Sequence, residues 1–195
     1  MDLQTLLALT GLATSMTWTP GPNNMMLAAS GANFGWRRTL PHALGVSIGF
    51  PVMLIAVSLG LGQVFQAWPP LAKVLGWIGF LVVLWFAWRI GTADAASVKG
   101  PKRPLNFLQA CAFQWVNPKA WTFAVWTTAT YAIGWQTAVI AALVFLGTGL
   151  ASSQAWVVLG AWMGTFLGTG LRLRVFNVVM AVLLVIAGAW LMLAA

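Results

Sequence analysis

A hydrophobic run near the start of the chain is interrupted by Thr19-Pro20-Gly21-Pro22-Asn23-Asn24. From Leu6 to Ala32 this run contains no charged residue. Proline lacks the amide donor that a helix needs, and its ring clashes with the backbone one turn earlier, so the helix must break here. In a bilayer, the backbone groups freed by a break must meet protein or a water-lined cavity. The break is therefore the first candidate for a substrate site.

The composition is that of an integral membrane protein. Of the 195 residues 61% are hydrophobic and 6% are charged, whereas roughly a quarter of the residues in soluble domains are charged. The net charge of +8 does not indicate nucleic-acid binding, because the basic residues lie between the hydrophobic runs, as in membrane proteins. We therefore expect the lipid bilayer as a partner and no nucleic acid.

Runs long enough to cross a bilayer, about 20 residues each, predict an all-α polytopic membrane protein with six transmembrane segments in one domain, residues 1–195. The predicted segments are 3–34, 39–62, 70–91, 105–131, 136–163 and 174–194. The first and fourth segments are broken. As single helices they would be about 47 Å and about 40 Å long, against a hydrocarbon core of roughly 30 Å. They could be tilted, re-entrant or partly interfacial, so the depth of the breaks stays open.

The basic residues between segments predict the orientation. They form three groups: Arg37 and Arg38, the stretch from Arg89 to Arg103 with Lys99 and Lys102, and Arg172 with Arg174. In a six-segment chain these groups lie on one face, which should be cytoplasmic. The opposite face has only Lys73. Both termini should then lie outside the cytoplasm.

The pattern of segments repeats. Each half, about residues 1–95 and 104–195, has a broken segment followed by two continuous ones, and the second break is Asn117-Pro118-Lys119. Three segments per half place the two halves in opposite orientations. Inverted repeats with matching broken segments point to the binding site of a transporter. The alternative is two unrelated proline kinks.

A helix should restart after each break. Pro22 or Asn23 can begin the first restart, and Pro118 can begin the second with Asn117 as its cap. A helix start offers free amide donors and a partial positive charge, which together can hold a carboxylate. The alternative is that Asn23, Asn24 and Asn117 only cap helices.

Lys119 is the most informative single residue. A lysine at a helix start opposes the helix dipole, and a buried lysine needs a partner. The two acidic residues, Asp2 and Asp94, lie at or beyond segment ends. A backbone carbonyl or a substrate carboxylate could be the partner of Lys119. It could also be neutral, or it could extend to water if the break lies near a membrane surface.

Other polar and aromatic residues are weaker candidates. Gln114 closely precedes the second break, so it joins the candidate site. Ser152, Ser153 and Gln154 could line a pathway or bond across helices. Three tryptophans around the second break could wall a pocket: Trp115, Trp121 and Trp126. Glycines four apart, at 45 and 49 and at 160 and 164, are interpreted as close helix packing. One cysteine and one histidine give no metal constellation, and we expect neither a metal nor a cofactor.

Both proline motifs resemble the lysine exporter/homoserine-threonine exporter family. The resemblance rests on Thr19-Pro20-Gly21-Pro22-Asn23, on Asn117-Pro118-Lys119-Ala120 and on six segments in about 200 residues, and it covers nearly the whole chain. It implies export of amino acids or similar small metabolites from the bacterial cytoplasm through the inner membrane, typically driven by the proton gradient. By motif match it points to Pro20, Gly21, Pro22, Asn23, Asn117, Pro118 and Lys119.

The chain departs from that family at one point. Many members carry an acidic residue in the second segment shortly after a glycine, whereas here Gly49 is followed by Phe50-Pro51. A buried substrate cation would have no acid to pair with. A neutral amino acid, an amide or another carboxylate-bearing metabolite therefore fits better than a strongly cationic substrate.

The leading hypothesis is a secondary exporter of amino acids or related carboxylate-bearing metabolites. The candidate site residues are Pro20, Gly21, Pro22, Asn23, Asn24, Gln114, Asn117, Pro118 and Lys119. The alternative is a non-transporting membrane scaffold or accessory subunit that keeps the fold. An enzyme is not expected, because the chain has no paired acid–base or metal-ligand set. The sequence leaves a homo-oligomer open.

Overall fold

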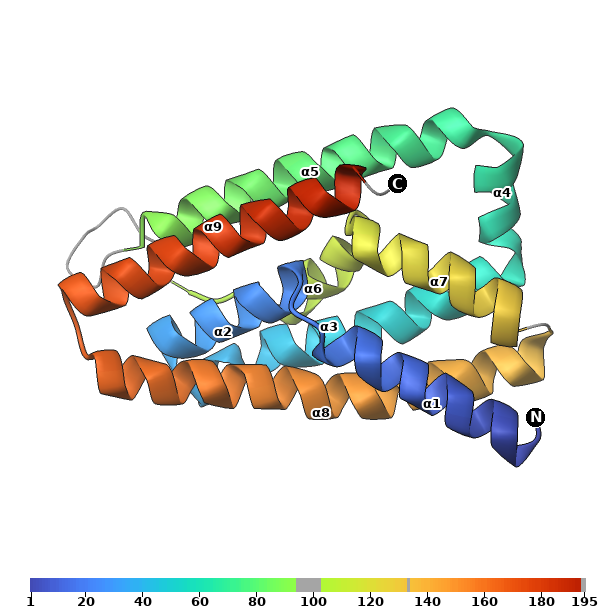
Figure 1. Ribbon diagram of the computed structural model, residues 1–195, viewed down its shortest axis with the longest axis horizontal. Helices are drawn as coiled ribbons and strands as arrows, with labels where there is room; N and C mark the ends of the chain where they lie inside the picture. The colour runs from blue at the N-terminus through green and yellow to red at the C-terminus, as the bar shows by residue number, and fades with distance from the viewer. Residues whose placement is uncertain (94–102, 133, 194–195) are drawn as a thin grey trace.

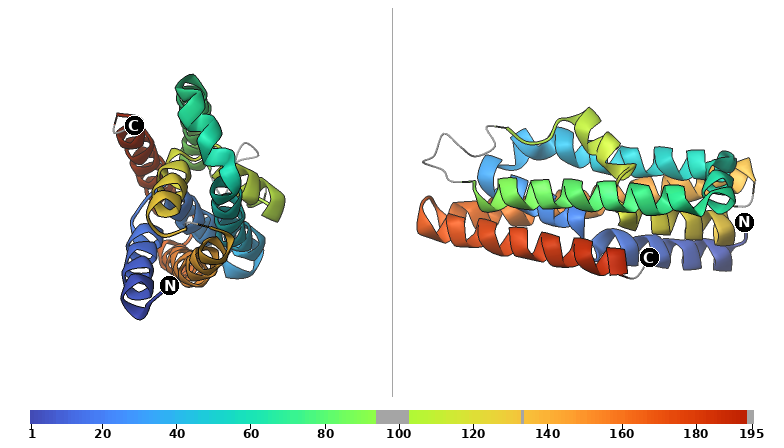
Figure 2. Two further views of the ribbon diagram at one scale, coloured as in Figure 1. Left: turned by 90° about the vertical axis from the view of Figure 1, so that its right-hand side faces the viewer. Right: turned by 90° about the horizontal axis from the view of Figure 1, so that it is seen from above.

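The structure is a computed structural model that describes residues 1–93, 103–132 and 134–193. All regular secondary structure in these residues is helical. Several residues named above, Asp94, Lys99, Lys102 and the end of the last predicted segment at Ala194, lie outside the described residues. The long helices run along one axis, as Figure 1 and the end-on view of Figure 2 show, and the short helix α4 crosses it at one end.

The helices follow one another along the chain, and the longest connection, residues 92–106, joins α5 to α6. Their bounds are α1 Leu3–Trp18, α2 Pro22–Phe34, α3 Trp36–Ala56, a π-helical turn η1 Val57–Leu61, α4 Gly62–Ala67, α5 Pro69–Gly91, α6 Phe107–Gln114, α7 Pro118–Tyr131, α8 Trp135–Leu167 and α9 Leu171–Leu193.

Within the described residues, four helices are long and apolar enough to cross a membrane. They span Trp36–Leu61, Lys73–Gly91, Trp135–Leu167 and Leu171–Met192, and they correspond to the second, third, fifth and sixth predicted segments. The first and fourth predicted segments each consist of two shorter helices, α1 with α2 and α6 with α7. In Figure 1 the members of each pair follow one another along the bundle.

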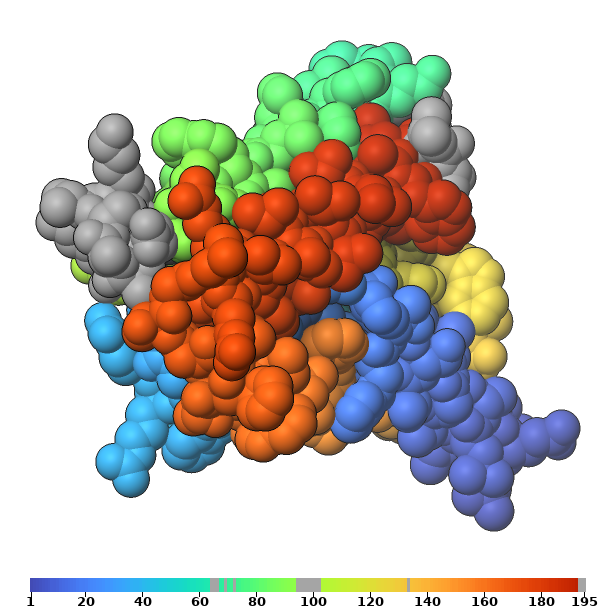
Figure 3. Space-filling model, turned by 60° about the vertical axis from the view of Figure 1, so that its left-hand side comes forward, coloured from blue at the N-terminus to red at the C-terminus, as the bar shows by residue number. Residues whose placement is uncertain are grey.

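Large apolar side chains cover the outside of the bundle. On α5 and α9, Leu81, Ile186 and Trp190 are 61%, 57% and 67% exposed. Figure 3 shows α9 in red on this outer face, beside α5 in green. Extended apolar surface of this kind is rare on soluble monomers and is what lipid tails contact.

Both predicted helix breaks are confirmed. The first helix ends at Trp18 and α2 begins at Pro22, with Gly21 as its N-cap in an extended conformation at φ −169°. The second break follows Gln114, and α7 begins at Pro118 with Asn117 as its N-cap. Figure 1 places both breaks about half-way along the bundle.

Glycines bring the helices close together around the breaks. Helix α2 packs on α8, and a Cβ at Gly160 would lie 2.0 Å from the carbonyl oxygen of Ala28. Helix α3 packs on α6, where a Cβ at Gly45 would lie 2.4 Å from the carbonyl oxygen of Phe107. The predicted packing role of these glycines is confirmed.

Candidate substrate site

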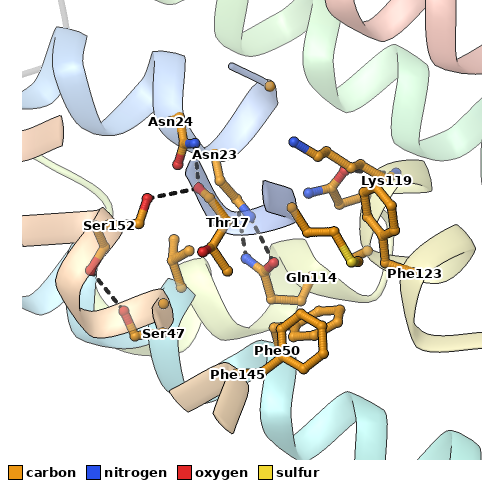
Figure 4. Close-up of a pocket in the computed structure, with 17 residues that line it drawn as sticks. Thr17, Asn23, Asn24, Ser47, Phe50, Gln114, Lys119, Phe123, Phe145 and Ser152 are labelled. Atoms are coloured by element: carbon orange, nitrogen blue, oxygen red, sulfur yellow. Dashed lines mark hydrogen bonds between the residues drawn. The ribbon is translucent and has the colours of Figure 1, made fainter. Parts of the chain in front are cut away.

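A cavity of about 80 Å³ lies where the two breaks meet. Its lining comes from α1, α2, α3, α6, α7, α8 and the two linkers, so both halves of the chain contribute to it (Figure 4). A single buried water needs roughly 10–15 Å³ of cavity volume. The cavity is therefore several times larger than a single water site.

The structure brings six of the nine predicted site residues together. The predicted residues that line the cavity are Gly21, Asn23, Asn24, Gln114, Asn117 and Lys119. The three prolines do not line it. Pro22 and Pro118 are buried as the first residues of α2 and α7, and Pro20 is exposed in the linker. The prolines end and restart the helices, which sets the positions of their polar neighbours.

A pair of side-chain amides joins the two breaks. Asn23 Nδ2 donates to Gln114 Oε1 at 2.8 Å, and Gln114 Nε2 donates back to Asn23 Oδ1 at 3.2 Å. Gln114 Nε2 also donates to the carbonyl of Ala110 at 3.0 Å. Because Gln114 is completely buried, losing either partner would leave an amide unsatisfied.

The carbonyl groups at the end of α1 also receive donors. Asn24 Nδ2 donates to the carbonyl oxygens of Thr17 at 2.8 Å and Thr19 at 3.0 Å. Ser152 Oγ on α8 donates to the Thr17 oxygen at 2.7 Å. Asn24 therefore caps the end of α1, as the capping alternative allows, and it also lines the cavity.

The start of α2 has no side-chain cap. Its N-cap is Gly21, which has no side chain to accept from the first amides, and Asn23 is engaged with Gln114. At the second break, Asn117 Oδ1 accepts from the Lys119 amide at 3.1 Å, so the prediction of Asn117 as a cap is confirmed. The uncapped amides and the positive end of the α2 dipole favour an anion at this point.

Lys119 extends across the cavity from α7 to the first break. Its Nζ donates to the carbonyl oxygen of Thr19 at 3.0 Å and lies 5.8 Å from the centre of the Phe123 ring. A Cβ at Gly21 would lie 3.1 Å from Nζ, so glycine leaves the space that the ammonium occupies. No carboxylate is among the described residues that line the cavity.

Hydroxyl groups and phenyl rings form the rest of the wall. Ser47 Oγ and Ser153 Oγ lie 2.8 Å apart, bridging α3 and α8. Phe50 and Phe145 pack with their ring centres 4.9 Å apart. Figure 4 shows these rings on the side of the cavity opposite the Asn24 amide.

The predicted tryptophan wall is wrong. Trp121 Nε1 donates to the carbonyl oxygen of Trp115 at 2.7 Å, and both rings pack against an apolar cluster that includes Leu9 and Ala124 without lining the cavity themselves. Trp126 is 46% exposed. Gln154 also lies elsewhere, since its Oε1 accepts from Trp36 Nε1 at 2.8 Å on the exposed surface.

A profile of proteins described as LysE type translocators matches residues 14–195. The chain belongs to this family. It is therefore a multi-pass membrane transporter and not an enzyme, and the resemblance expected from the proline motifs is confirmed.

Curated relatives of this translocator are bacterial efflux proteins. It is 30% identical over 179 residues to a protein of Salmonella paratyphi A named cysteine/O-acetylserine efflux protein, covering 86% of the chain and 87% of the relative. It is 29% identical over 184 residues to the protein of that name in Escherichia coli K12, covering 89% of each. None of the solved structures is a significant match.

Sequence reasoning missed part of the translocator's cavity. Thr17, Ser47, Phe50 and Phe145 line it, but no local motif marks them, because they reach the site only through the packing of α1, α3 and α8. One feature of the sequence pointed to Phe50. It follows Gly49, and many family members carry an acidic residue shortly after this glycine. The cavity thus has hydrogen-bond donors at one end, around Lys119 and the start of α2. Hydroxyl oxygens, carbonyl oxygens and phenyl rings form its other walls.

Proposed function

We propose that the translocator is a secondary transporter that exports a neutral amino acid, or a similar small carboxylate-bearing metabolite, from the bacterial cytoplasm through the inner membrane. The relatives named cysteine/O-acetylserine efflux proteins support substrates of this size and charge. The central cavity would be the binding site.

The observation that carries this proposal is the Lys119 ammonium. It has a backbone carbonyl as its hydrogen-bond acceptor, and an ammonium has three donors. A substrate carboxylate beside Nζ would supply the negative charge that is absent from the lining residues the structure describes. The uncapped amides at the start of α2 would add further donors to the same anion.

The remaining walls suit the other parts of an amino acid. The hydroxyl oxygens of Ser47 and Ser153 can accept from the substrate ammonium. Phe50 and Phe145 can pack against an uncharged side chain. A second positive charge on the substrate would find no carboxylate among the described lining residues, and a desolvated cation without a partner is costly.

The proposed architecture is six transmembrane segments in two inverted halves, 1–95 and 104–195, within a single domain. Each restart has an N-cap followed by proline and a polar residue, Gly21-Pro22-Asn23 in one half and Asn117-Pro118-Lys119 in the other. Each broken pair also packs on the long helix of the opposite half, α1 and α2 on α8, and α6 and α7 on α3. Export would then follow rocking of the two halves around the central site.

The proposed orientation follows the positive-inside rule. Figure 1 places the ends of α2, α5 and α8 at one end of the bundle and the N-terminus at the other. The first end carries Arg37, Arg38, Arg89, Arg172 and Arg174 close by in the chain. That end would face the cytoplasm, with both termini outside.

Counterflow tests the function. Purified protein in liposomes loaded with unlabelled O-acetyl-L-serine or L-cysteine should accumulate the labelled compound above protein-free liposomes. The same compounds should raise the unfolding temperature of the detergent-solubilised protein. A non-transporting scaffold predicts no counterflow and no stabilisation across a screen of amino acids.

A further inference from the structure

A second cavity, of about 60 Å³, lies toward the arginine end of the bundle. We call it the entry cavity. Its walls come from α2, α3, α5 and residues 103–105, and it includes His42, Arg89 and Arg103. No acidic side chain is among the lining residues that the structure describes. The described part of this wall therefore carries positive charge.

His42 is buried in this wall without a hydrogen-bond partner. Its side chain is 2% exposed, and neither Nδ1 nor Nε2 has a partner within the described part of the chain. Buried polar groups are almost always hydrogen-bonded, because leaving them unpaired costs free energy. His42 is thus a buried group in this wall whose hydrogen bonding a ligand could complete.

The neighbouring polar groups are already occupied. Ser30 Oγ and Thr39 Oγ1 lie 3.0 Å apart. Asn33 and Asn177 exchange hydrogen bonds of 2.7 and 3.0 Å between their side-chain amides. His42 and the arginines are thus the groups that remain for a ligand.

The two arginines give the cavity its preference for an oxyanion. The Arg89 guanidinium lies 4.8 Å from the centre of the Trp85 ring, and Arg89 lines the cavity. Arg103 lies exposed on the linker that leads to α6. Guanidinium groups bind carboxylates and phosphates through paired, charge-assisted hydrogen bonds.

We propose that the entry cavity binds the carboxylate of the exported amino acid before it moves to the central cavity. This rests on the proposed function. Helix α2 lines both cavities, with Asn24 at the central one and Ser30 at the entry cavity, about 9 Å apart along the helix. A neutral imidazole has one donor and one acceptor, which match the carboxylate and the ammonium of a zwitterion.

The same oxyanion chemistry could come from a phospholipid headgroup, since basic pockets near a membrane surface also bind lipid phosphates. The experiment therefore separates the two sources. It measures binding of labelled O-acetyl-L-serine by equilibrium dialysis, with the full chain in nanodiscs of phosphatidylcholine or phosphatidylglycerol. The starting protein is Lys119→Ala, in which the central site should be lost.

The proposal predicts that Lys119→Ala protein still binds one ligand per chain. Adding Arg89→Gln with Arg103→Gln should weaken this binding by about ten-fold or more, because charge-assisted hydrogen bonds are lost. Adding His42→Leu, which removes the imidazole without leaving an unpaired group, should also weaken it. The matched control is Arg172→Gln with Arg174→Gln, which removes two exposed arginines of α9 and should change nothing.

Three results would overturn the proposal: no residual binding in Lys119→Ala, residual binding unaffected by the entry-cavity variants, or binding abolished in phosphatidylglycerol. The last would assign the cavity to a lipid headgroup. None of these results bears on whether counterflow depends on Lys119, so failure of the entry cavity is distinguishable from failure of the exporter.

Discussion

The ammonium of Lys119 lies 3.0 Å from the carbonyl oxygen of Thr19, one hundred residues away along the chain. This contact joins the start of α7 to the break after α1. A positive charge near the end of α1 is favourable because the helix dipole is negative there. The same ammonium lies near the positive start of its own helix, α7, which is unfavourable. An anion bound in the cavity would offset this repulsion.

The Asn23–Gln114 amide pair should stabilise the fold cooperatively. Asn23→Ala leaves the buried Gln114 Oε1 without its donor, and Gln114→Ala leaves the half-buried Asn23 amide unpaired, so each should lower the free energy of unfolding by about 1–3 kcal/mol. The double variant should lose less than the sum of the two single variants, because no unpaired partner remains. Thermal unfolding in detergent measures all three. Additive losses would show that the two amides do not depend on each other.

Close packing of α2 on α8 should not tolerate a methyl group at Gly160. Gly160→Ala places a Cβ 2.0 Å from the Ala28 oxygen, and forcing the helices apart should cost about 1–3 kcal/mol. Gly147→Ala is the matched control on the same helix, where a Cβ meets nothing within 4 Å. Since alanine favours helix by about 1 kcal/mol over glycine, the control should unfold at the same temperature or higher. Equal destabilisation in both would contradict the packing.

Charge selectivity should follow from the absence of an acid in the described lining. Counterflow of O-acetyl-L-serine should be inhibited by excess L-cysteine and not by excess L-lysine. Phe50→Glu, which places an acid beside Gly49, should make L-lysine an inhibitor, because a carboxylate could pair with its side chain. Thermal unfolding checks that the variant still folds. Strong inhibition of the unaltered protein by lysine would contradict the proposed site.

Orientation can be read from two engineered cysteines. In a Cys111→Ala background, Lys73→Cys should react with a membrane-impermeant maleimide on intact cells. Arg174→Cys should react only after the membrane is opened, because positive residues stay in the cytoplasm. Both side chains are exposed, so burial does not explain a difference. The reverse pattern would invert the proposed topology.

Much of the fold could be predicted because it depends on local chemistry. The lengths of the hydrophobic runs predicted the continuous helices. Helices α2 and α7 begin at Pro22 and Pro118 because proline suits the first helical position. The depth of the breaks could not be derived, since segment length alone does not distinguish a tilted helix from a broken pair in the middle of a bundle.

The site was only partly predictable for a related reason. Lys119 and Gln114 stand next to a break, so the sequence marks them. Ser47 and Phe145 are ordinary helix residues that become lining only when α3 and α8 meet beside α1. The tryptophans failed as predictors because proximity in sequence to Asn117 does not set the direction of a side chain, and Trp121 turns to the Trp115 carbonyl instead.

The central claim is that Lys119 binds the substrate carboxylate in the cavity between the breaks. Counterflow of labelled O-acetyl-L-serine by Lys119→Ala, beside the exposed-lysine control Lys73→Ala, tests it most directly. We predict that Lys119→Ala loses at least about ten-fold in initial rate, as expected for a charged hydrogen-bond partner, while its unfolding remains cooperative and Lys73→Ala transports normally. Undiminished counterflow by folded Lys119→Ala would contradict the account.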